Sequence, residues 1–258
     1  MTEILSILRL ARNDFSYFFR TKWLMAILLS LNLSDMLVVA LVYNKLMSFD
    51  YFRFFVPAVV VMGLFVAALD TGRRIWLAIG EGVIHYYLSL PISTFGIVVA
   101  YLLAGGLAAV VYSTALLLVA LVVLPAQAIW STFILLPFIF VLAMGLAGIS
   151  AALAALSSTH GEFFFAYQQI VQTLLLTLST VFYPVEVVGK YLPPFLVSVV
   201  SANPLSLAAE AMRQYTFAGQ PVQPFYLLNI LIASVPLVVV GAVSYLVVLH
   251  AIQVKGKL

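Results

Sequence analysis

The sequence has no cysteine and very few charged residues. The absence of cysteine among 258 residues excludes disulfides, thiolate metal sites and cysteine nucleophiles. Charged residues make up 8% of the chain and hydrophobic residues 65%, against about 25% and about 45–50% in a soluble domain. So few charges cannot cover the surface of a soluble fold of this size, which excludes soluble enzymes and disordered regulators. The twelve Lys and Arg residues are spread over the whole chain, so we expect no nucleic-acid partner.

Long apolar runs are what the sequence has instead. A helix needs about 20 predominantly apolar residues to cross the hydrocarbon core of a bilayer. Six segments meet this requirement: 23–43, 52–69, 95–124, 129–156, 166–182 and 225–250. Continuous runs of this length favour helices over the alternating strands of about ten residues found in membrane barrels. We therefore predict an all-α, polytopic membrane protein in which residues 1–258 form a single transmembrane domain.

The distribution of Lys and Arg predicts the orientation in the membrane. With the N-terminus inside, eight of these residues lie on the cytoplasmic side and four, Lys45, Arg53, Lys190 and Arg213, lie outside. Basic residues are enriched in cytoplasmic loops, so we expect both termini in the cytoplasm and the protein in the plasma membrane. The first apolar run follows a charged segment of 22 residues, and we expect it to remain as a span rather than to be removed as a signal peptide.

Three segments outside the spans predict further helices. Residues 1–22 place apolar side chains, among them Ile4, Leu8, Ala11 and Phe18, and basic side chains on opposite helical faces. This pattern predicts an interfacial helix at the inner membrane surface, and the alternative is an ordinary charged leader before the first span. The cytoplasmic segment 70–94 predicts a short helix that ends near Pro91 and packs either on a soluble partner or on the protein's own spans. The external segment 183–224 contains six prolines and two short apolar stretches, which predicts a re-entrant or interfacial helical hairpin before the last span.

Polar residues inside the predicted spans mark a candidate translocation path or dimer interface. Asn32 and Asp35 share one face of the first span, and Asp35 lies about 18 Å along the helix from Trp23. A charge at this depth costs on the order of 3 kcal/mol, so Asp35 is also a candidate proton or cation site. The fifth span carries a further polar set: Gln169, Gln172, Thr173 and Thr177. Such residues either line a cavity or hold helices together by hydrogen bonds, and both interpretations stay open.

Two stretches resemble motifs of one transporter family. Residues 81–92, EGVIHYYLSLPI, resemble the "EGTLExLLxxPI" coupling segment of type-2 ABC exporter permeases, although Val83 and His85 stand where that family often has Thr and Glu. Residues 203–213, NPLSLAAEAMR, resemble the "NPLTYxxEAxR" stretch that precedes the last span in the same family. The resemblance covers essentially the whole chain, from an interfacial N-terminal helix through six spans with a coupling segment after the second.

The resemblance implies the permease subunit of an ATP-driven exporter of drugs, lipids or lipid-linked polysaccharides. It implies pairing with a second copy or a related permease, and with two ABC ATPase subunits that hold ATP and Mg²⁺. The residues that it places against the ATPase are Glu81, Gly82, Ile84, His85, Tyr86, Leu88 and Pro91. In the external hairpin it points to Pro184, Asn203, Pro204, Glu210 and Arg213.

The residues themselves indicate that any ATPase is a separate chain. A nucleotide-binding loop of the G-x-x-x-x-G-K-[ST] type is absent, because the two Gly-Lys pairs, at 189–190 and 256–257, lack both the first glycine and the final Ser or Thr. The single histidines His85 and His160 have no metal-ligand spacing. We therefore expect no catalytic residue, no cofactor and no metal in this chain.

Two other functions fit parts of the sequence. Gly148-Ile149-Ser150-Ala151 on the fourth span and His250 at the end of the sixth resemble the G-x-S-x nucleophile and the base of rhomboid-type intramembrane serine proteases. A proton-coupled carrier or channel using Asp35 would work without an ATPase. Loss of activity in Ser150→Ala would favour the protease, whereas stable association with an ATPase would favour the exporter.

Overall fold

The computed structural model describes residues 2–157 and 161–255, and every element in these two ranges is a helix. The elements in chain order are α1 (Thr2–Arg20), α2 (Lys22–Ser34), the π-helical turn η1 (Asp35–Val39), α3 (Ala40–Leu46), α4 (Tyr51–Gly80), α5 (Val83–Ser89), α6 (Thr94–Val123), α7 (Ile129–Leu156), α8 (Gly161–Thr177), α9 (Val185–Tyr191), α10 (Pro194–Ala202), α11 (Pro204–Ala211), the π-helical turn η2 (Met212–Phe217) and α12 (Pro224–Lys255).

Several of these helices are built to cross a membrane. Within the described ranges, five helical segments are long and apolar enough: α2–η1–α3, α4, α6, α7 and α12. A sixth candidate is the pair formed by α10 with α11–η2, whose two halves are bent by 64°. The all-α fold and the multi-pass membrane character are thus as the sequence predicts.

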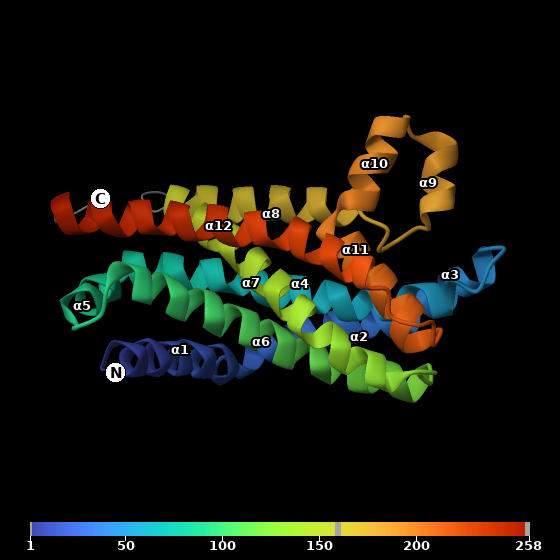
Figure 1. The fold of residues 1–258 in the computed structure, drawn as a ribbon, viewed down its shortest axis with the longest axis horizontal. Coiled ribbons are helices and arrows are strands. Elements are labelled where there is room, and N and C mark those ends of the chain that lie inside the picture. Colours follow the sequence, from blue (N-terminus) through green and yellow to red (C-terminus); the bar gives the residue numbers. More distant parts are fainter. Residues whose placement is uncertain (1, 158–160, 256–258) are drawn as a thin grey trace.

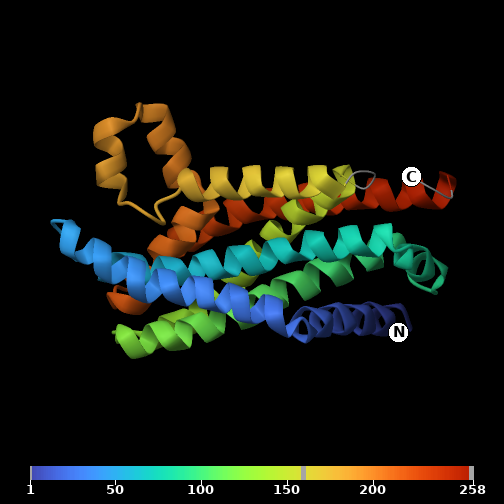
Figure 2. The ribbon, with the colours of Figure 1, turned by 180° about the vertical axis from the view of Figure 1, so that it is seen from behind.

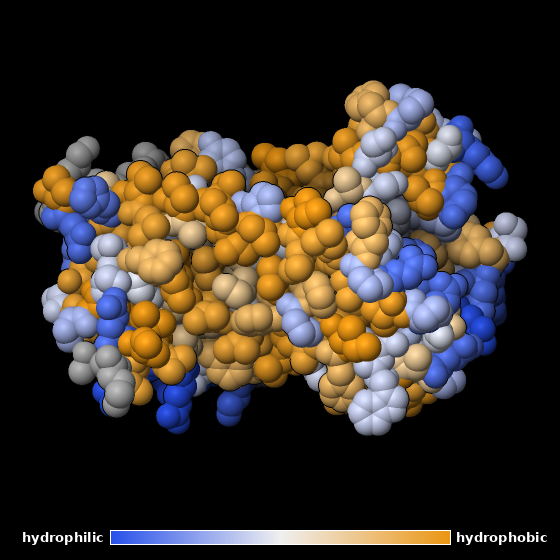
Figure 3. Space-filling model, viewed as in Figure 1, coloured by the Kyte–Doolittle hydropathy of each residue, from blue (hydrophilic) through white to orange (hydrophobic). Residues whose placement is uncertain are grey.

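The long helices run side by side along the longest axis of the molecule (Figures 1 and 2). The start of α1, the helix α5 and the end of α12 lie at one end of this bundle, which we call the α5 end (Figure 1). The helices α9–α11 and α3 lie at the opposite end, which we call the hairpin end. Polar side chains gather at the two ends, and the surface between them is mostly apolar (Figure 3), as lipid contact requires.

The helix α4 forms the centre of the bundle. In its apolar stretch 78% of the residues are buried, against 17–44% in the other four long segments. α4 packs on α6 and α7, and α7 packs closely on α12. The last contact depends on two glycines, because a Cβ atom on Gly241 would lie only 2.2 Å from Cα of Gly148. Small residues therefore bring these backbones together, as in many helix pairs within membranes.

α4 is longer than the predicted second span, 52–69. Residues 70–80, which the sequence places in the cytoplasmic segment 70–94, continue the helix to Gly80. The extension is packed on the protein's own helices, since the Trp76 ring stacks on Phe164 of α8 with 6.2 Å between the ring centroids. The short helix expected before Pro91 is α5, which begins after a turn at residues 81–82.

The first and fifth predicted spans have different outcomes. Residues 23–43 lie within the continuous segment α2–η1–α3, whereas the predicted span 166–182 corresponds to α8, which differs at both boundaries and, with 17 residues, is not among the candidate spans of the described ranges. α8 begins at Gly161 and ends at Thr177, and the following residues up to 184 are not helical. The early end has a local cause, because Nδ2 of Asn203 donates hydrogen bonds to the carbonyl oxygens of Leu175, at 2.8 Å, and Leu178, at 2.6 Å. These carbonyls would otherwise be left without partners at a helix terminus.

The N-terminal helix α1 lies beside α6 and runs along the bundle in both views (Figures 1 and 2). Its buried side chains are Leu10, Ala11, Asp14 and Phe18. Ile4 and Leu8, which the sequence groups with Ala11 and Phe18, are instead 65% and 54% exposed. The contact face of α1 is therefore rotated toward Asp14, and its position in the inner membrane interface stays a prediction.

Candidate functional site

A groove of about 510 Å³ runs between α2–η1 and α8, and α4 forms its floor. Four of the six residues predicted to lie on a path or interface line this groove: Asn32, Asp35, Gln169 and Gln172. The other two, Thr173 and Thr177, are exposed on α8 and do not line it. The fold thus brings polar residues of the first and fifth predicted spans to one place.

Both walls of the groove combine apolar and polar side chains, because Asn32 and Asp35 lie on the α2–η1 side and Phe165 and Leu176 on the α8 side. α2 contributes three leucines on one helical stripe: Leu24, Leu28 and Leu31. α8 contributes three glutamines: Gln168, Gln169 and Gln172. An amide side chain both donates and accepts hydrogen bonds and carries no charge. One molecule lying in the groove could therefore contact apolar side chains and hydrogen-bonding groups on both walls.

Asn32 and Asp35 have different roles in this wall. Nδ2 of Asn32 donates to the carbonyl oxygen of Leu28 at 2.8 Å and to the hydroxyl of Tyr112 on α6 at 3.1 Å, so this side chain joins two helices. Asp35 is only partly buried and begins the π-helical turn η1. Such turns interrupt the regular hydrogen-bond ladder of a helix and occur frequently at functional sites. Asn32 therefore fits the prediction of a contact between helices. Asp35 fits the prediction of a residue that lines a cavity.

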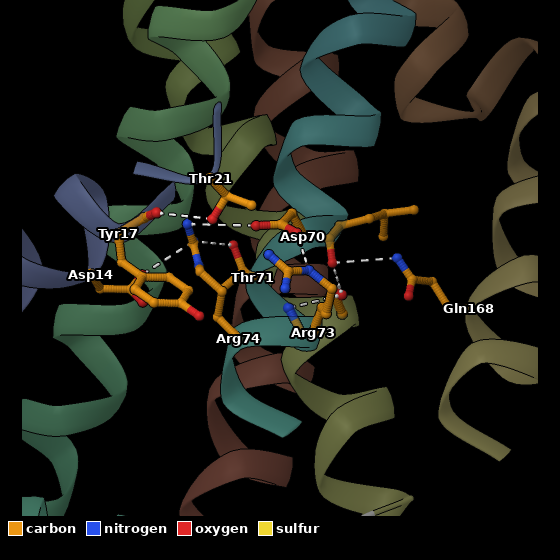
Figure 4. Close-up of polar contacts among 11 residues, drawn as sticks. Asp14, Tyr17, Thr21, Asp70, Thr71, Arg73, Arg74 and Gln168 are labelled. Atoms are coloured by element: carbon orange, nitrogen blue, oxygen red, sulfur yellow. Dashed lines mark hydrogen bonds and ion pairs between the residues drawn. The ribbon is translucent and has the colours of Figure 1, made fainter. Parts of the chain in front are cut away.

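Charged residues close the groove floor toward the α5 end. Nε of Arg73 lies 2.6 Å from Oδ1 of Asp70, and both residues line the groove. On the other side of α4, Nη1 of Arg74 lies 3.7 Å from Oδ2 of Asp70, and Nη2 lies 3.1 Å from Oδ2 of Asp14 on α1. Figure 4 shows these contacts, with Asp14 of α1 on one side of α4 and, on the other, Gln168 of α8, whose Nε2 donates to the carbonyl oxygen of Leu69 at 3.5 Å.

Sequence reasoning missed this cluster, which we call the ionic quartet: Asp14, Asp70, Arg73 and Arg74. It placed all four residues outside the spans or at a span end. The spacing of Asp70 to Arg73 and Arg74, three and four residues along a helix, could have indicated the contacts within α4. The contact with α1 could not be read from spacing, because the two helices are far apart in the chain.

The predicted coupling residues form a turn and a short helix that extend from the end of α4. Gly82 has a φ of 72°, a left-handed conformation that glycine adopts without steric cost and that lets the chain reverse between α4 and α5. Ile84 is fully buried and anchors α5, and Leu88 is partly buried. The remaining predicted residues are exposed: Glu81, His85, Tyr86 and Pro91. The turn and helix thus present a mixed polar and aromatic surface at the α5 end.

Arg213 holds the hairpin end together. Its Nε donates to the carbonyl oxygen of Phe54 at 2.8 Å, and its Nη2 donates to that of Thr180 at 2.9 Å. Nη1 lies 3.2 Å from Oε2 of Glu210, and the guanidinium carbon lies 3.7 Å from the centroid of the Phe54 ring. The side chain is only 9% exposed. One residue thus joins η2, the start of α4 and the segment that follows α8.

The other hairpin residues define where its helices begin. Pro184 immediately precedes α9, and Pro204 is the first residue of α11, a position where its missing N–H costs no hydrogen bond. Oδ1 of Asn203 accepts a hydrogen bond from the backbone N–H of Leu205 at 2.9 Å and so caps α11. The bend between α10 and α11 therefore follows from the Asn203-Pro204 pair.

Packing accounts for the serine that resembles a protease nucleophile. The hydroxyl of Ser150 donates to the carbonyl oxygen of Leu69 at 2.5 Å and accepts from the backbone N–H of Gly72 at 3.1 Å. Ser150 is fully buried against α4, and His250 is exposed on α12. Among the described residues the partners of this hydroxyl are backbone groups of α4, and the structure gives no serine–histidine pair.

Within the described ranges, no group of three or more His, Asp or Glu side chains could hold a metal ion. No protein-family model and no curated protein matches this chain. A functional assignment therefore rests on the groove, on the surface at the α5 end and on the two sequence motifs.

Proposed function

We propose that this chain is the permease subunit of an ATP-driven exporter of the type-2 ABC family and that it moves a hydrophobic or amphipathic molecule along the groove. The observation that carries the proposal is the double role of α4. This helix forms the groove floor through Met62, Val66, Asp70 and Arg73, and it leads through the turn at Gly82 into α5. A displacement of α5 would therefore reach the groove floor through one continuous helix.

The surface at the α5 end suits a soluble ATPase partner. Tyr86 is 62% exposed, and Glu81 and His85 are also exposed, while the buried side chain of Ile84 anchors α5 to the rest of the bundle. Exposed aromatic side chains with a polar surround are typical of protein interfaces. Two ATPase subunits, which hold the ATP and Mg²⁺, would each bind one permease at this surface. This chain would contribute no catalytic group.

A second permease would complete the path. The outer faces of α2 and α8 carry exposed apolar side chains beside the groove: Trp23, Ile27, Ile170 and Leu174. Packing of a second copy, or of a related chain, over these faces would close the groove into a channel. The bilayer would cover the remaining apolar surface, with both termini and α5 in the cytoplasm. The substrate would be a drug, a lipid or a lipid-linked glycan.

Purification of the tagged chain from its native membranes in mild detergent tests this proposal. We expect a second chain that contains a Walker-type nucleotide loop, together with vanadate-sensitive ATPase activity. The variant His85→Ala/Tyr86→Ala should lose both, because it removes exposed side chains and leaves the anchor Ile84 in place. Trp130→Ala, which changes a residue that is 77% exposed at the start of α7, is the matched control and should keep both. An active, folded protein without any ATPase would overturn the proposal.

A proton-coupled carrier is the second candidate function. The observation that favours it is the position of Asp35, which lines the groove at the start of the π-helical turn η1. In this case transport would follow a proton gradient without ATP, and Asp35→Asn would abolish the response to pH. Transport that needs ATP and is unchanged by Asp35→Asn would exclude the carrier.

A further inference from the structure

We propose that the ionic quartet is a switchable latch through which the docking of α1 controls the charges at the floor of the groove. The latch does not depend on the function proposed above, because it concerns only contacts within this chain. Its moving part is α1, its fixed part is α4, and the ligand to which it responds is the proton.

The quartet is buried and electrically balanced. Asp14, Asp70 and Arg74 are 8%, 7% and 3% exposed, and Arg73 is mostly buried at the groove. Two carboxylates face two guanidinium groups, so the four charges cancel. Burying charges costs free energy even when they are paired, and apolar residues of similar size would often hold two helices together at least as well. The docking of α1 on α4 therefore does not by itself explain why charged residues are buried between these two helices.

The hydrogen bonding of the quartet is incomplete. Among the described residues, Nη2 of Arg73 and Nε of Arg74 are buried without a hydrogen-bond partner, and Oδ2 of Asp14, Oδ2 of Asp70 and Nη1 of Arg74 have only the ion pairs given above. Fully satisfied networks rigidify a core and specify one arrangement, and this quartet is not such a network. Asp70 is shared by both arginines, at 2.6 Å from Arg73 and 3.7 Å from Arg74. A change at Asp14 would therefore alter the partner of Asp70 and, through it, the side chain of Arg73 in the groove.

Protons have a route to the latch. A cavity of about 110 Å³ lies beside Asp14 between α1, the end of α4, α5 and α6. The titratable and charged groups that face or influence Asp14 from the packed elements are Asp70, Arg73, Arg74 and Glu81 from α4 and its end, Tyr87 from α5, Tyr101 from α6 and Tyr245 from α12. Burial raises the pKa of Asp14 from 3.8 to about 6, and the neighbouring Arg74 acts in the opposite direction.

The sign of the pH effect follows from this shift. The pKa of Asp14 is higher when α1 is docked than when α1 is free in water, so the docked state binds the proton more tightly. Docking therefore strengthens as the pH falls through about 6 and weakens above it. Between pH 7 and pH 5 the undocked fraction should fall about tenfold, from the two pKa values of about 6 and 3.8.

The absence of cysteine makes a direct test simple, because a single introduced thiol is the only one in the chain. Ala11→Cys places it on the buried face of α1, and Leu8→Cys places it on the exposed face of the same helix. The full chain in lipid nanodiscs is treated with a maleimide at pH 5 to 7. Dividing the labelling rate of Ala11→Cys by that of Leu8→Cys removes the pH dependence of thiol ionisation, which both variants share. The remaining ratio reports the fraction of molecules in which α1 is undocked.

Four outcomes decide the proposal. The rate ratio should fall about tenfold from pH 7 to pH 5 in the parent chain, and Asp14→Asn should make it low and independent of pH. Arg73→Gln, on the groove side, should raise the ratio severalfold at pH 7, since Asp70 would then draw Arg74 away from Asp14. That effect should disappear in the Asp14→Asn background. Asp50→Asn, which removes an exposed ion pair with Arg53 at the far end of α4, is the control and should change nothing.

Two results would overturn the latch. A ratio that does not vary with pH in the parent chain, or that varies equally in Asp14→Asn, rejects Asp14 as the switch. An Arg73→Gln variant with the parent ratio rejects the link between α1 and the groove. Neither result depends on the presence of an ATPase or on a substrate, so failure of the latch and failure of the proposed function are separate observations.

Discussion

Removal of the Arg213 side chain should destabilise the hairpin end by about 3.5–8 kcal/mol. Arg213 donates hydrogen bonds of 2.8 Å and 2.9 Å to the carbonyl oxygens of Phe54 and Thr180, and each hydrogen bond to a charged group contributes about 1.5–3 kcal/mol. Its guanidinium also lies over the Phe54 ring, a cation–π contact of about 0.5–2 kcal/mol. The ion pair with Glu210 adds little, because that carboxylate is 36% exposed.

The assay is unfolding in mixed micelles of dodecyl maltoside and SDS, followed by circular dichroism. Arg213→Ala removes every contact, whereas Arg213→Lys keeps a positive charge near Glu210 but loses the planar fork that reaches two carbonyl oxygens at once. We therefore expect Lys to restore less than half of the lost free energy of unfolding. Arg53→Ala is the control, because Arg53 is 71% exposed in an ion pair at the surface and should change stability by less than about 1 kcal/mol.

The result that refutes this reasoning is specific. If Arg213→Ala lowered the free energy of unfolding by no more than Arg53→Ala, the buried guanidinium would contribute nothing beyond a surface charge. If Arg213→Lys were as stable as the parent chain, charge rather than the fork geometry would be the cause.

Three further predictions follow from the helix contacts. Gly72→Ala should cost at least about 3 kcal/mol of unfolding free energy, since its Cβ would lie 2.3 Å from a backbone oxygen of α7, whereas Gly80→Ala meets no atom within 4 Å and should be neutral or slightly stabilising; the same micelle assay measures both. Asn32→Ala and Tyr112→Phe should show a coupling of about 0.6 kcal/mol in a double-mutant cycle, and a coupling of zero would contradict the hydrogen bond of 3.1 Å between them. Asp35→Asn should leave the fold and its melting temperature unchanged, because the partly buried carboxylate has no hydrogen-bond or ion-pair partner among the described residues, and a large loss of stability would show that it is structural.

Local sequence signals were sufficient for several elements. The continuous apolar runs predict the long helices, because backbone groups in lipid must be satisfied within each segment. The Asn203-Pro204 pair marks the start of α11, since a proline and a capping side chain act on their own neighbours. The short helix before Pro91 is likewise visible in the sequence, and the structure places it at Val83–Ser89. These signals act over a few residues, so one sequence is enough to read them.

The candidate site was predicted only in part. Asn32, Asp35, Gln169 and Gln172 could be named because polar residues are conspicuous inside apolar runs. Their meeting at one groove, and the exclusion of Thr173 from it, depend on how α2 and α8 pack on α4. Ser150 shows the same limit, because the motif around it suggests a nucleophile and only its contacts with the backbone of α4 reveal a packing role.

By itself the sequence determined that this chain is an all-α membrane protein and located five of its candidate membrane-spanning helices, whereas the sixth candidate in the described ranges, the bent pair of α10 with α11–η2, lies in the segment predicted as an external hairpin. Only the tertiary structure decided where α4 ends, what Arg213 joins and which charges are buried. The physical reason is that Asp14, on α1, and Arg74, on α4, each read as solvated when taken alone. A charged side chain can be buried inside a protein when an oppositely charged partner on another helix pairs with it. Packing, rather than the neighbouring residues in the chain, decides which partner that is.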